Sequence, residues 1–167
     1  VVTVGNVTNS NLKRKGLETF VKAAAYLPDL RFVLIGEHRD NSINHLRAIK
    51  TQNVELIGYV NDEQLLEYYQ KAKVYVQVSA HEGFGIAMAE AMSCGCVPVV
   101  TDRGAIPEVV ADTGFYVPYD DPKTTAEAIK NALKSNKGGE ARKRIEGNFT
   151  LAIRENRLIK IINEVTK

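Results

Sequence analysis

The chain has 167 residues, of which 44% are hydrophobic and 25% are charged, and its formal net charge is +2. This composition fits one soluble globular domain and excludes a disordered or fibrous protein. The small net charge provides no general attraction to nucleic acid, and no apolar run approaches the roughly 20 residues that a membrane span requires. The chain begins at Val1 without an initiator methionine, and we expect a fragment that starts at a domain boundary.

Short β-branched runs alternate with segments of helical period along most of the chain. The expected strands are residues 1–4, 31–35, 54–57, 74–78, 97–100 and 115–117. The expected helices are residues 15–26, 41–50, 62–71, 85–93, 106–111 and 120–133, and residues 6–11 are expected to be a polar loop. Continuous apolar strands separated by helices indicate a parallel sheet that is covered on both faces. The pattern therefore predicts a Rossmann-like, three-layer α/β/α sandwich with a six-stranded parallel sheet.

The pattern changes after residue 134. Lys137-Gly138-Gly139 is expected to break the chain, and two helical segments follow at residues 140–146 and 151–165. We therefore expect a single domain over residues 1–167, with a core at 1–134 and C-terminal helices within 137–167. The last helix carries an apolar stripe from Leu151 to Ile162, which should pack on this domain or on a partner.

Ligands bind such sheets beyond the carboxyl ends of the strands. Residues 79–85 (SAHEGFG) follow the fourth expected strand and contain Glu82, and Glu90 lies eight residues further on. Eight helical residues span about 12 Å, whereas two carboxylates that act on one bond lie about 5–9.5 Å apart. The two glutamates are therefore expected to hold two ends of one elongated ligand.

A helix is expected to begin between these two acids. The residues that lead into it are Gly83, Phe84, Gly85 and Ile86. The free amides and the dipole of a helix N-terminus favour an anion, so a diphosphate between two hydroxylated rings fits this order. Arg14 and Lys15, after the first strand, are candidate cations for that diphosphate.

An ordered series of motifs resembles the C-terminal, donor-binding domain of a family 4 glycosyltransferase of the GT-B fold. The motifs are Val4-Gly5, Lys15-Gly16, VLIG at 33–36, LIGYV at 56–60, SAHEGFG at 79–85, AEAM at 89–92, GCVPVV at 95–100 and GAIPE at 104–108. The resemblance covers residues 1 to about 134. It implies one half of a retaining, metal-independent enzyme that uses a nucleotide-sugar donor and no cofactor.

The resemblance also implies roles for individual residues. Glu82 and Lys15 would be catalytic: Glu82 would contact hydroxyls of the transferred sugar, and Lys15 would stabilise the leaving diphosphate. Glu90 would bind the ribose. The remaining donor-binding residues would be the backbone amides of Gly83, Phe84, Gly85 and Ile86, the side chain of Arg14, and Gly58, Tyr59, Val60 and Leu65 around the base.

The chain departs from the family pattern at Asn6, where an arginine usually follows the first glycine. Either Arg14 takes over that contact, or the diphosphate is bound more weakly. The expected partners are a UDP-, GDP- or ADP-sugar and a missing N-terminal domain that binds the acceptor, with no nucleic acid. We expect a cytoplasmic protein, and the basic run at residues 142–144 is either an exposed helix face or a contact with anionic lipid at the inner face of the membrane.

Three other functions fit parts of the sequence. A non-catalytic nucleotide-binding α/β module and half of a nucleotide-sugar epimerase remain as alternatives to the transferase. A Rossmann oxidoreductase fits poorly, because no Gly-x-Gly-x-x-Gly fingerprint follows the first strand.

Overall fold

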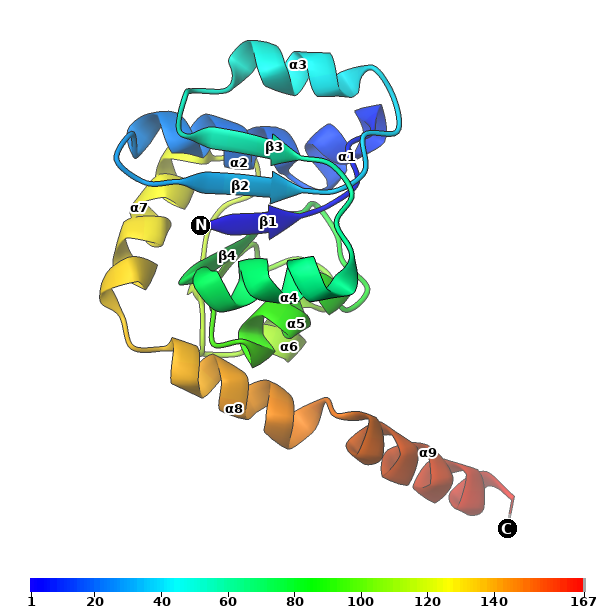
Figure 1. Cartoon of the computed structure of the whole chain (residues 1–167). Helices are drawn as coiled ribbons and strands as arrows, with labels where there is room; N and C mark the ends of the chain where they lie inside the picture. Colours follow the sequence, from blue (N-terminus) through cyan, green and yellow to red (C-terminus); the bar gives the residue numbers. More distant parts are fainter. Residues whose placement is uncertain (167) are drawn as a thin grey trace.

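A computed structural model of the chain describes residues 1–166, and Lys167, the end of the expected C-terminal helices, lies outside the described residues. Six parallel strands form one sheet in the order β3-β2-β1-β4-β5-β6 (Figure 1). The strands are β1 (Val2–Val4), β2 (Phe32–Ile35), β3 (Val54–Ile57), β4 (Val74–Gln77), β5 (Val97–Val100) and β6 (Phe115–Tyr116). Each lies within a residue of its expected bounds, so the predicted six-stranded parallel sheet is confirmed.

Helices cover both faces of the sheet, as predicted for a three-layer sandwich. One face carries α1 (Asn9–Arg14), α2 (Leu17–Ala23), α3 (Ser42–Ile49) and α7 (Pro122–Lys134). The other face carries α4 (Asp62–Lys71), α5 (Ile86–Ser93), α6 (Ile106–Val110) and α8 (Gly138–Asn148). A 3₁₀ turn, η1 (Ala24–Tyr26), and α9 (Leu151–Val165) complete the described elements. Side chains from the two faces of the strands feed two apolar clusters, one under each helical layer.

The expected loop at residues 6–11 is wrong, because α1 begins at Asn9. The hydroxyl of Thr8 accepts a hydrogen bond from the Asn11 amide at 3.2 Å and caps the helix. The next helix begins at Leu17 rather than Lys15, since Gly16 has a left-handed backbone (φ 68°) that separates α1 from α2. Arg14 and Lys15 therefore lie at a corner between two helices.

The expected break at Lys137-Gly138-Gly139 is also misplaced. The chain turns at Ser135, whose backbone is extended, and both glycines lie in the first turn of α8. A β-carbon on Gly138 would lie 2.2 Å from the Gly95 carbonyl oxygen, so this glycine permits close packing. Ala141 and Ile145 are buried against the α5 and α6 layer, and the packed unit thus extends through α8.

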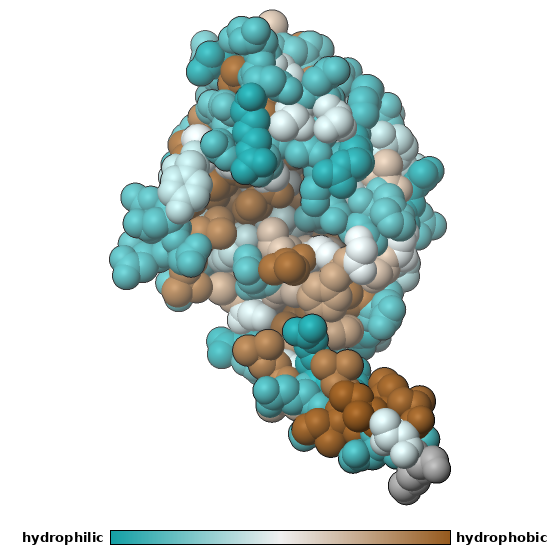
Figure 2. Space-filling model, turned by 90° about the vertical axis from the view of Figure 1, so that its right-hand side faces the viewer, coloured by the Kyte–Doolittle hydropathy of each residue, from teal (hydrophilic) through white to brown (hydrophobic). Residues whose placement is uncertain are grey.

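Helix α9 projects away from the sandwich (Figure 1), and none of its described residues is buried. Its apolar side chains form a patch on the helix at the bottom of Figure 2. The exposed residues are Leu151, Leu158, Ile159, Ile161, Ile162 and Val165. We expected the stripe to pack either on this domain or on a partner, and the structure shows that it does not pack on this domain. Within residues 1–166, no helix is long and apolar enough to span a bilayer.

A substitution at Gly16 tests whether the corner before α2 requires a glycine. A β-carbon there would lie 2.2 Å from the Val78 carbonyl oxygen, and the backbone is left-handed. We expect Gly16→Ala to lower the free energy of unfolding by at least about 1–2 kcal/mol, the cost of the left-handed conformation alone. Urea denaturation measures this loss. Gly139→Ala is the control, because its β-carbon meets no atom within 4 Å and alanine favours the helix by roughly 0.5–1 kcal/mol; equal stability of the two variants would contradict this interpretation.

Candidate functional site

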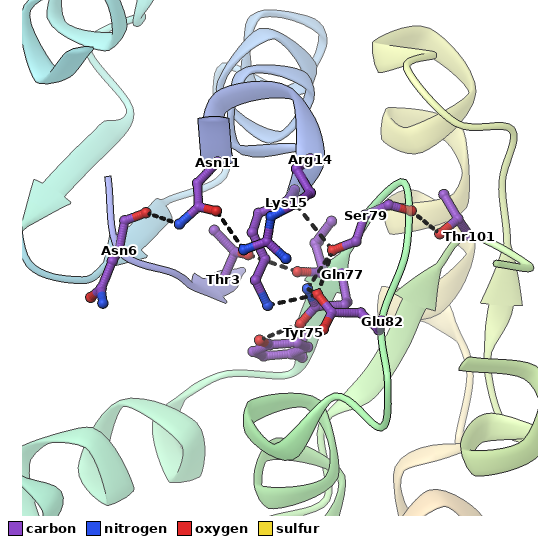
Figure 3. Close-up of polar contacts among 11 residues, drawn as sticks. Thr3, Asn6, Asn11, Arg14, Lys15, Tyr75, Gln77, Ser79, Glu82 and Thr101 are labelled. Carbon is purple, nitrogen blue, oxygen red and sulfur yellow. Dashed lines mark hydrogen bonds and ion pairs between the residues drawn. The ribbon is translucent and has the colours of Figure 1, made fainter. Parts of the chain in front are cut away.

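The candidate site lies where the strand order reverses, between β1 and β4. The segments that follow these two neighbouring strands leave in opposite directions, which opens a crevice at their carboxyl ends. The two segments are joined by a hydrogen bond from the Ala80 amide to the Arg14 carbonyl at 2.8 Å. Figure 3 shows the side chains that both segments direct toward this point.

Lys15 and Glu82, which follow the first and fourth strands, meet in the crevice. The ammonium of Lys15 lies 2.7 Å from Oε1 of Glu82. Glu82 is only 8% exposed, and the same oxygen accepts hydrogen bonds from Gln77 Nε2 at 3.0 Å and from the Ser79 hydroxyl at 2.9 Å. Three donors, one of them charged, offset the cost of removing this carboxylate from water.

The backbone of the β4–α5 loop is fixed by the segment after β5. The Glu82 carbonyl accepts a hydrogen bond from the Ala105 amide at 2.9 Å, and the Ser79 carbonyl accepts one from the Thr101 hydroxyl at 2.7 Å. Gly104 permits this contact, because a β-carbon there would lie 2.3 Å from the Glu82 carbonyl oxygen. The position of the Glu82 carboxylate is therefore set by two crossover segments as well as by Lys15.

Helix α5 begins in the crevice with its amides uncovered. Gly85, the residue before the helix, has a left-handed backbone (φ 83°), and within the described chain no side chain caps the helix start. Gly83 and Phe84 are exposed, and Ile86 is 68% exposed, so packed hydrocarbon does not seal this helix end. The helix start, Lys15, Glu82 and Gln77 line a cleft of about 330 Å³, whose amides and ammonium suit an anion.

Glu90 lies one turn into α5, as predicted, on the side of the helix that faces α4. Its Oε2 accepts a hydrogen bond from the Tyr69 hydroxyl at 3.2 Å. Glu90, Leu65 and Tyr69 line a second cleft of about 300 Å³. Burial raises the pKa of Tyr69, and the nearby carboxylate of Glu90 raises it further. The Tyr69 phenol therefore stays protonated, and the hydrogen bond that it donates orients the Glu90 carboxylate.

A buried aromatic pair lies between the two glutamates. The rings of Tyr69 and Tyr75 meet edge to face with centroids 6.1 Å apart. The Tyr75 hydroxyl donates to Gln77 Oε1 at 2.9 Å, and Gln77 in turn donates to Glu82. Both glutamates thus contact one connected set of side chains on the same side of the molecule.

Arg14 is held by α1 rather than by the loop that the sequence predicted. Its Nη2 donates to Asn11 Oδ1 at 2.7 Å, and the Asn11 side-chain amide donates to the Asn6 carbonyl at 2.8 Å. The guanidinium is thereby turned toward the crevice beside Lys15 (Figure 3). The side chain of Asn6, where the family pattern has arginine, instead accepts a hydrogen bond from the Glu37 amide.

The expected base-binding residues do not all come together. Leu65 shares a cleft with Glu90, but Tyr59 and Val60 line a different hollow together with Gln64 and Tyr68. Gly58 lies directly after β3, and its carbonyl accepts a hydrogen bond from the Gly36 amide. Tyr59 is 78% exposed, so its ring lies at the surface of that separate hollow.

Several polar residues of the site were not predicted from the sequence. Gln77 and Tyr75 lie in a mostly apolar strand, and Asn11 lies in a helix where the sequence predicts a loop. A buried glutamine at the last residue of a strand, directly before a loop that contains a carboxylate, is a signal that could have identified Gln77.

The basic run at residues 142–144 is not a uniformly exposed face, contrary to one expectation. Arg144 is partly buried, and its guanidinium donates to the carbonyls of Glu108 and Val109. Arg142 pairs with Glu146 at 2.7 Å. Two of the three cations of the run therefore already have partners within this domain.

The corner that carries Lys15 is anchored by Glu18, in the first turn of α2. Its carboxylate is 11% exposed and pairs with Lys22, and the ammonium of Lys13 and the ring of His45 each lie 3.6 Å away. Lys13 also pairs with Asp120 at 3.1 Å. This network joins α1, α2, α3 and the loop before α7 behind the site.

The fold is a Rossmann-like α/β domain, and the candidate anion site lies between β1 and β4. Residues 6–149 match the family described as Glycosyl transferases group 1, and the chain belongs to that family. Its curated relatives include the alpha-maltose-1-phosphate synthase of Mycolicibacterium smegmatis, which is 33% identical over 148 residues. That match covers 81% of this chain and 37% of the relative, so the chain spans little more than a third of that relative.

Solved structures show the same fold. The C-terminal domain of a glycosyl transferase group 1 family protein from Francisella tularensis has a TM-score of 0.76 at 19% identity, and the match covers 90% of this chain and 86% of that one. Anabaena HepE, in complex with UDP and glucose, has a TM-score of 0.85 at 18% identity, and the match covers 98% of this chain and 48% of that one. The fold is therefore one half of a GT-B glycosyltransferase.

Glu18 gives a pH-dependent test of the corner. The hydrogen bond from Lys22, with the charge of Lys13, lowers the pKa of Glu18 despite its burial. A lowered folded-state pKa contributes stability that is present above the unfolded value and lost as pH falls through the folded value. We expect Glu18→Gln to be less stable than wild type at pH 7, and the gap to close below about pH 4. Urea denaturation from pH 7 to 3, with exposed Glu127→Gln as control, measures it; a gap that does not change with pH would contradict this origin.

Proposed function

We propose that this chain is the donor-binding half of a retaining glycosyltransferase that transfers a hexose from a nucleotide sugar. One observation carries the proposal: the Lys15–Glu82 pair lies beside the uncovered start of α5, with Glu90 one turn further along the same helix. That order supplies a cation and amides for a diphosphate, and one carboxylate on each side for a hydroxylated ring. The family match and the UDP complex of a protein with the same fold support this assignment.

In this proposal each group of residues contacts a different part of the donor. Lys15, Arg14 and the amides of Phe84, Gly85 and Ile86 hold the diphosphate and stabilise the charge that develops as it leaves. Glu82 accepts hydrogen bonds from hydroxyls of the sugar, and Glu90 accepts them from the ribose. The sugar passes through an oxocarbenium-like state, and the acceptor attacks from the face that the diphosphate leaves. The chain supplies the positive charge for this step, so we propose a metal-independent reaction.

The acceptor site belongs to a second domain in this proposal. The chain spans 48% of a protein with the same fold, and in that architecture the acceptor domain precedes the donor domain. The exposed stripe of α9 and a groove of about 630 Å³ that it forms with Phe84, Ile86 and Phe149 face outward. We propose that the missing domain covers this surface, that the complete enzyme is cytoplasmic, and that the isolated chain binds donor weakly without turnover.

Calorimetry with UDP, GDP and ADP tests the assignment of Glu90. We expect the chain to bind at least one of these nucleotides, and Glu90→Ala to lower the affinity at least tenfold, which corresponds to about 1.4 kcal/mol. Glu67→Ala is the matched control, because this exposed glutamate of α4 pairs only with Lys71 in the described structure. Failure of all three nucleotides to bind would overturn the proposal, and equal affinity of the Glu90→Ala variant would overturn the role of Glu90.

A further inference from the structure

Gln77 lies at the end of β4, directly beneath the Lys15–Glu82 pair, and neither the proposed mechanism nor the family motifs assign it a role. It is 3% exposed. Its Nε2 donates to Glu82 Oε1 at 3.0 Å and to the Ser79 hydroxyl at 2.7 Å, while its Oε1 accepts from the Tyr75 hydroxyl at 2.9 Å (Figure 3). A buried side-chain amide with all these contacts has one orientation only.

Glu82 fixes which end of that amide faces it. A carboxylate paired with Lys15 only accepts hydrogen bonds, so the amide nitrogen points toward it and the amide oxygen points to the opposite side. There the oxygen accepts a hydrogen bond from the hydroxyl of Tyr75, a fully buried phenol whose pKa is raised by burial. Tyr75 and Gln77 thus form a donor chain that ends on Glu82 and carries no net charge.

Every hydrogen bond to the Glu82 side chain ends on the same oxygen. Lys15, Gln77 and Ser79 all donate to Oε1, and no described residue donates to Oε2. Glu82 and Gln77 both line the cleft at the start of α5. The arrangement leaves Oε2 as the acceptor for a ligand hydroxyl.

If the proposed function holds, Lys15 has two possible anionic partners, the Glu82 carboxylate and the diphosphate of the donor. It pairs with Glu82 in the present structure, and the diphosphate would compete for the same ammonium. When Lys15 turns to the diphosphate, Gln77 and Ser79 are the donors that remain on the buried carboxylate. A buried carboxylate that lost all its donors would bear the full desolvation cost.

We propose that Gln77 is a positioning residue of the donor site. It holds Glu82 in place, with Oε2 toward the sugar, while Lys15 engages the diphosphate. This inference rests on the proposed function and adds a residue that acts only through Glu82. Its effect should therefore appear in recognition of the sugar and not of the nucleotide.

The test measures the affinity gained from the sugar, which is the factor by which a nucleotide sugar binds more tightly than the corresponding nucleotide. This factor is compared between the wild-type chain and variants. Calorimetry gives Kd for UDP and UDP-glucose, for GDP and GDP-mannose, and for ADP and ADP-glucose. We expect the wild type to bind one nucleotide sugar more tightly than its nucleotide. Gln77→Leu should lower the affinity for that nucleotide sugar at least fivefold and change the affinity for the nucleotide less than twofold.

Gln77→Glu separates positioning from a loss of folding. It keeps the size of the side chain but places a second carboxylate about 3 Å from Glu82, and two carboxylates that close cannot both ionise at neutral pH. The affinity gained from the sugar should then vary with pH between about 5 and 8 in this variant, beyond any variation in wild type. Lys15, Tyr75, Glu90 and His81 are the other titratable groups around Glu82, and the wild-type profile accounts for them.

The outcomes are distinguishable. If the wild type binds none of the six ligands, the proposed function fails and this inference fails with it. If the wild type binds a nucleotide but gains nothing from its sugar, or if Gln77→Leu keeps the gain and Gln77→Glu keeps the wild-type pH profile, only the role of Gln77 is overturned. Urea denaturation of each variant confirms that the compared chains are folded.

Discussion

The partly buried ion pair between Lys15 and Glu82 is the interaction on which the site depends. It joins the corner after β1 to the loop after β4, the two segments that diverge at the reversal of strand order. Removing two charges from water costs about as much as their attraction returns, so such a pair contributes little to stability. Its place in a crevice is the reason for our proposal that a ligand uses both charges.

Close approaches of the backbone at glycine residues bring the two charged side chains together. Gly16 and Gly104 occupy places where a β-carbon would lie 2.2 Å and 2.3 Å from the carbonyl oxygens of Val78 and Glu82. The left-handed Gly85 starts α5 without a side-chain cap within the described chain, which leaves its amides free for an anion. Glycine at these three positions thus brings a cation, a carboxylate and a helix end into one cleft.

The sheet was predictable because the strands are short, mostly apolar runs separated by helical segments, and this alternation indicates a parallel sheet covered on both sides. The meeting of Lys15 with Glu82 was predictable for the same reason, since residues after neighbouring strands share one edge. Helix α1 was not predictable from its polar sequence, because the Thr8 cap and the Asn11 contact with Asn6 depend on the folded chain.

The polar layer beneath the glutamates was missed for a different reason. Tyr75 and Gln77 occupy buried strand positions, and the sequence does not distinguish an ordinary core residue from one that donates to a carboxylate. The separation of Tyr59 from Leu65 and Glu90 depends on how α4 lies against β3, which periodicity does not determine. Positions along the chain thus predicted which segments meet, but not the side-chain contacts that orient the charged groups.

The central claim is that a nucleotide sugar lies across the start of α5 between Glu82 and Glu90. The most direct measurement is an NMR titration of the ¹⁵N-labelled chain with UDP-glucose and with GDP-mannose. We predict that the largest shifts, with one of the two ligands, fall on the amides of residues 82–88 and of Lys15 and Gly16. Shifts confined to the groove beside α9, or no shifts with either ligand, would contradict the account.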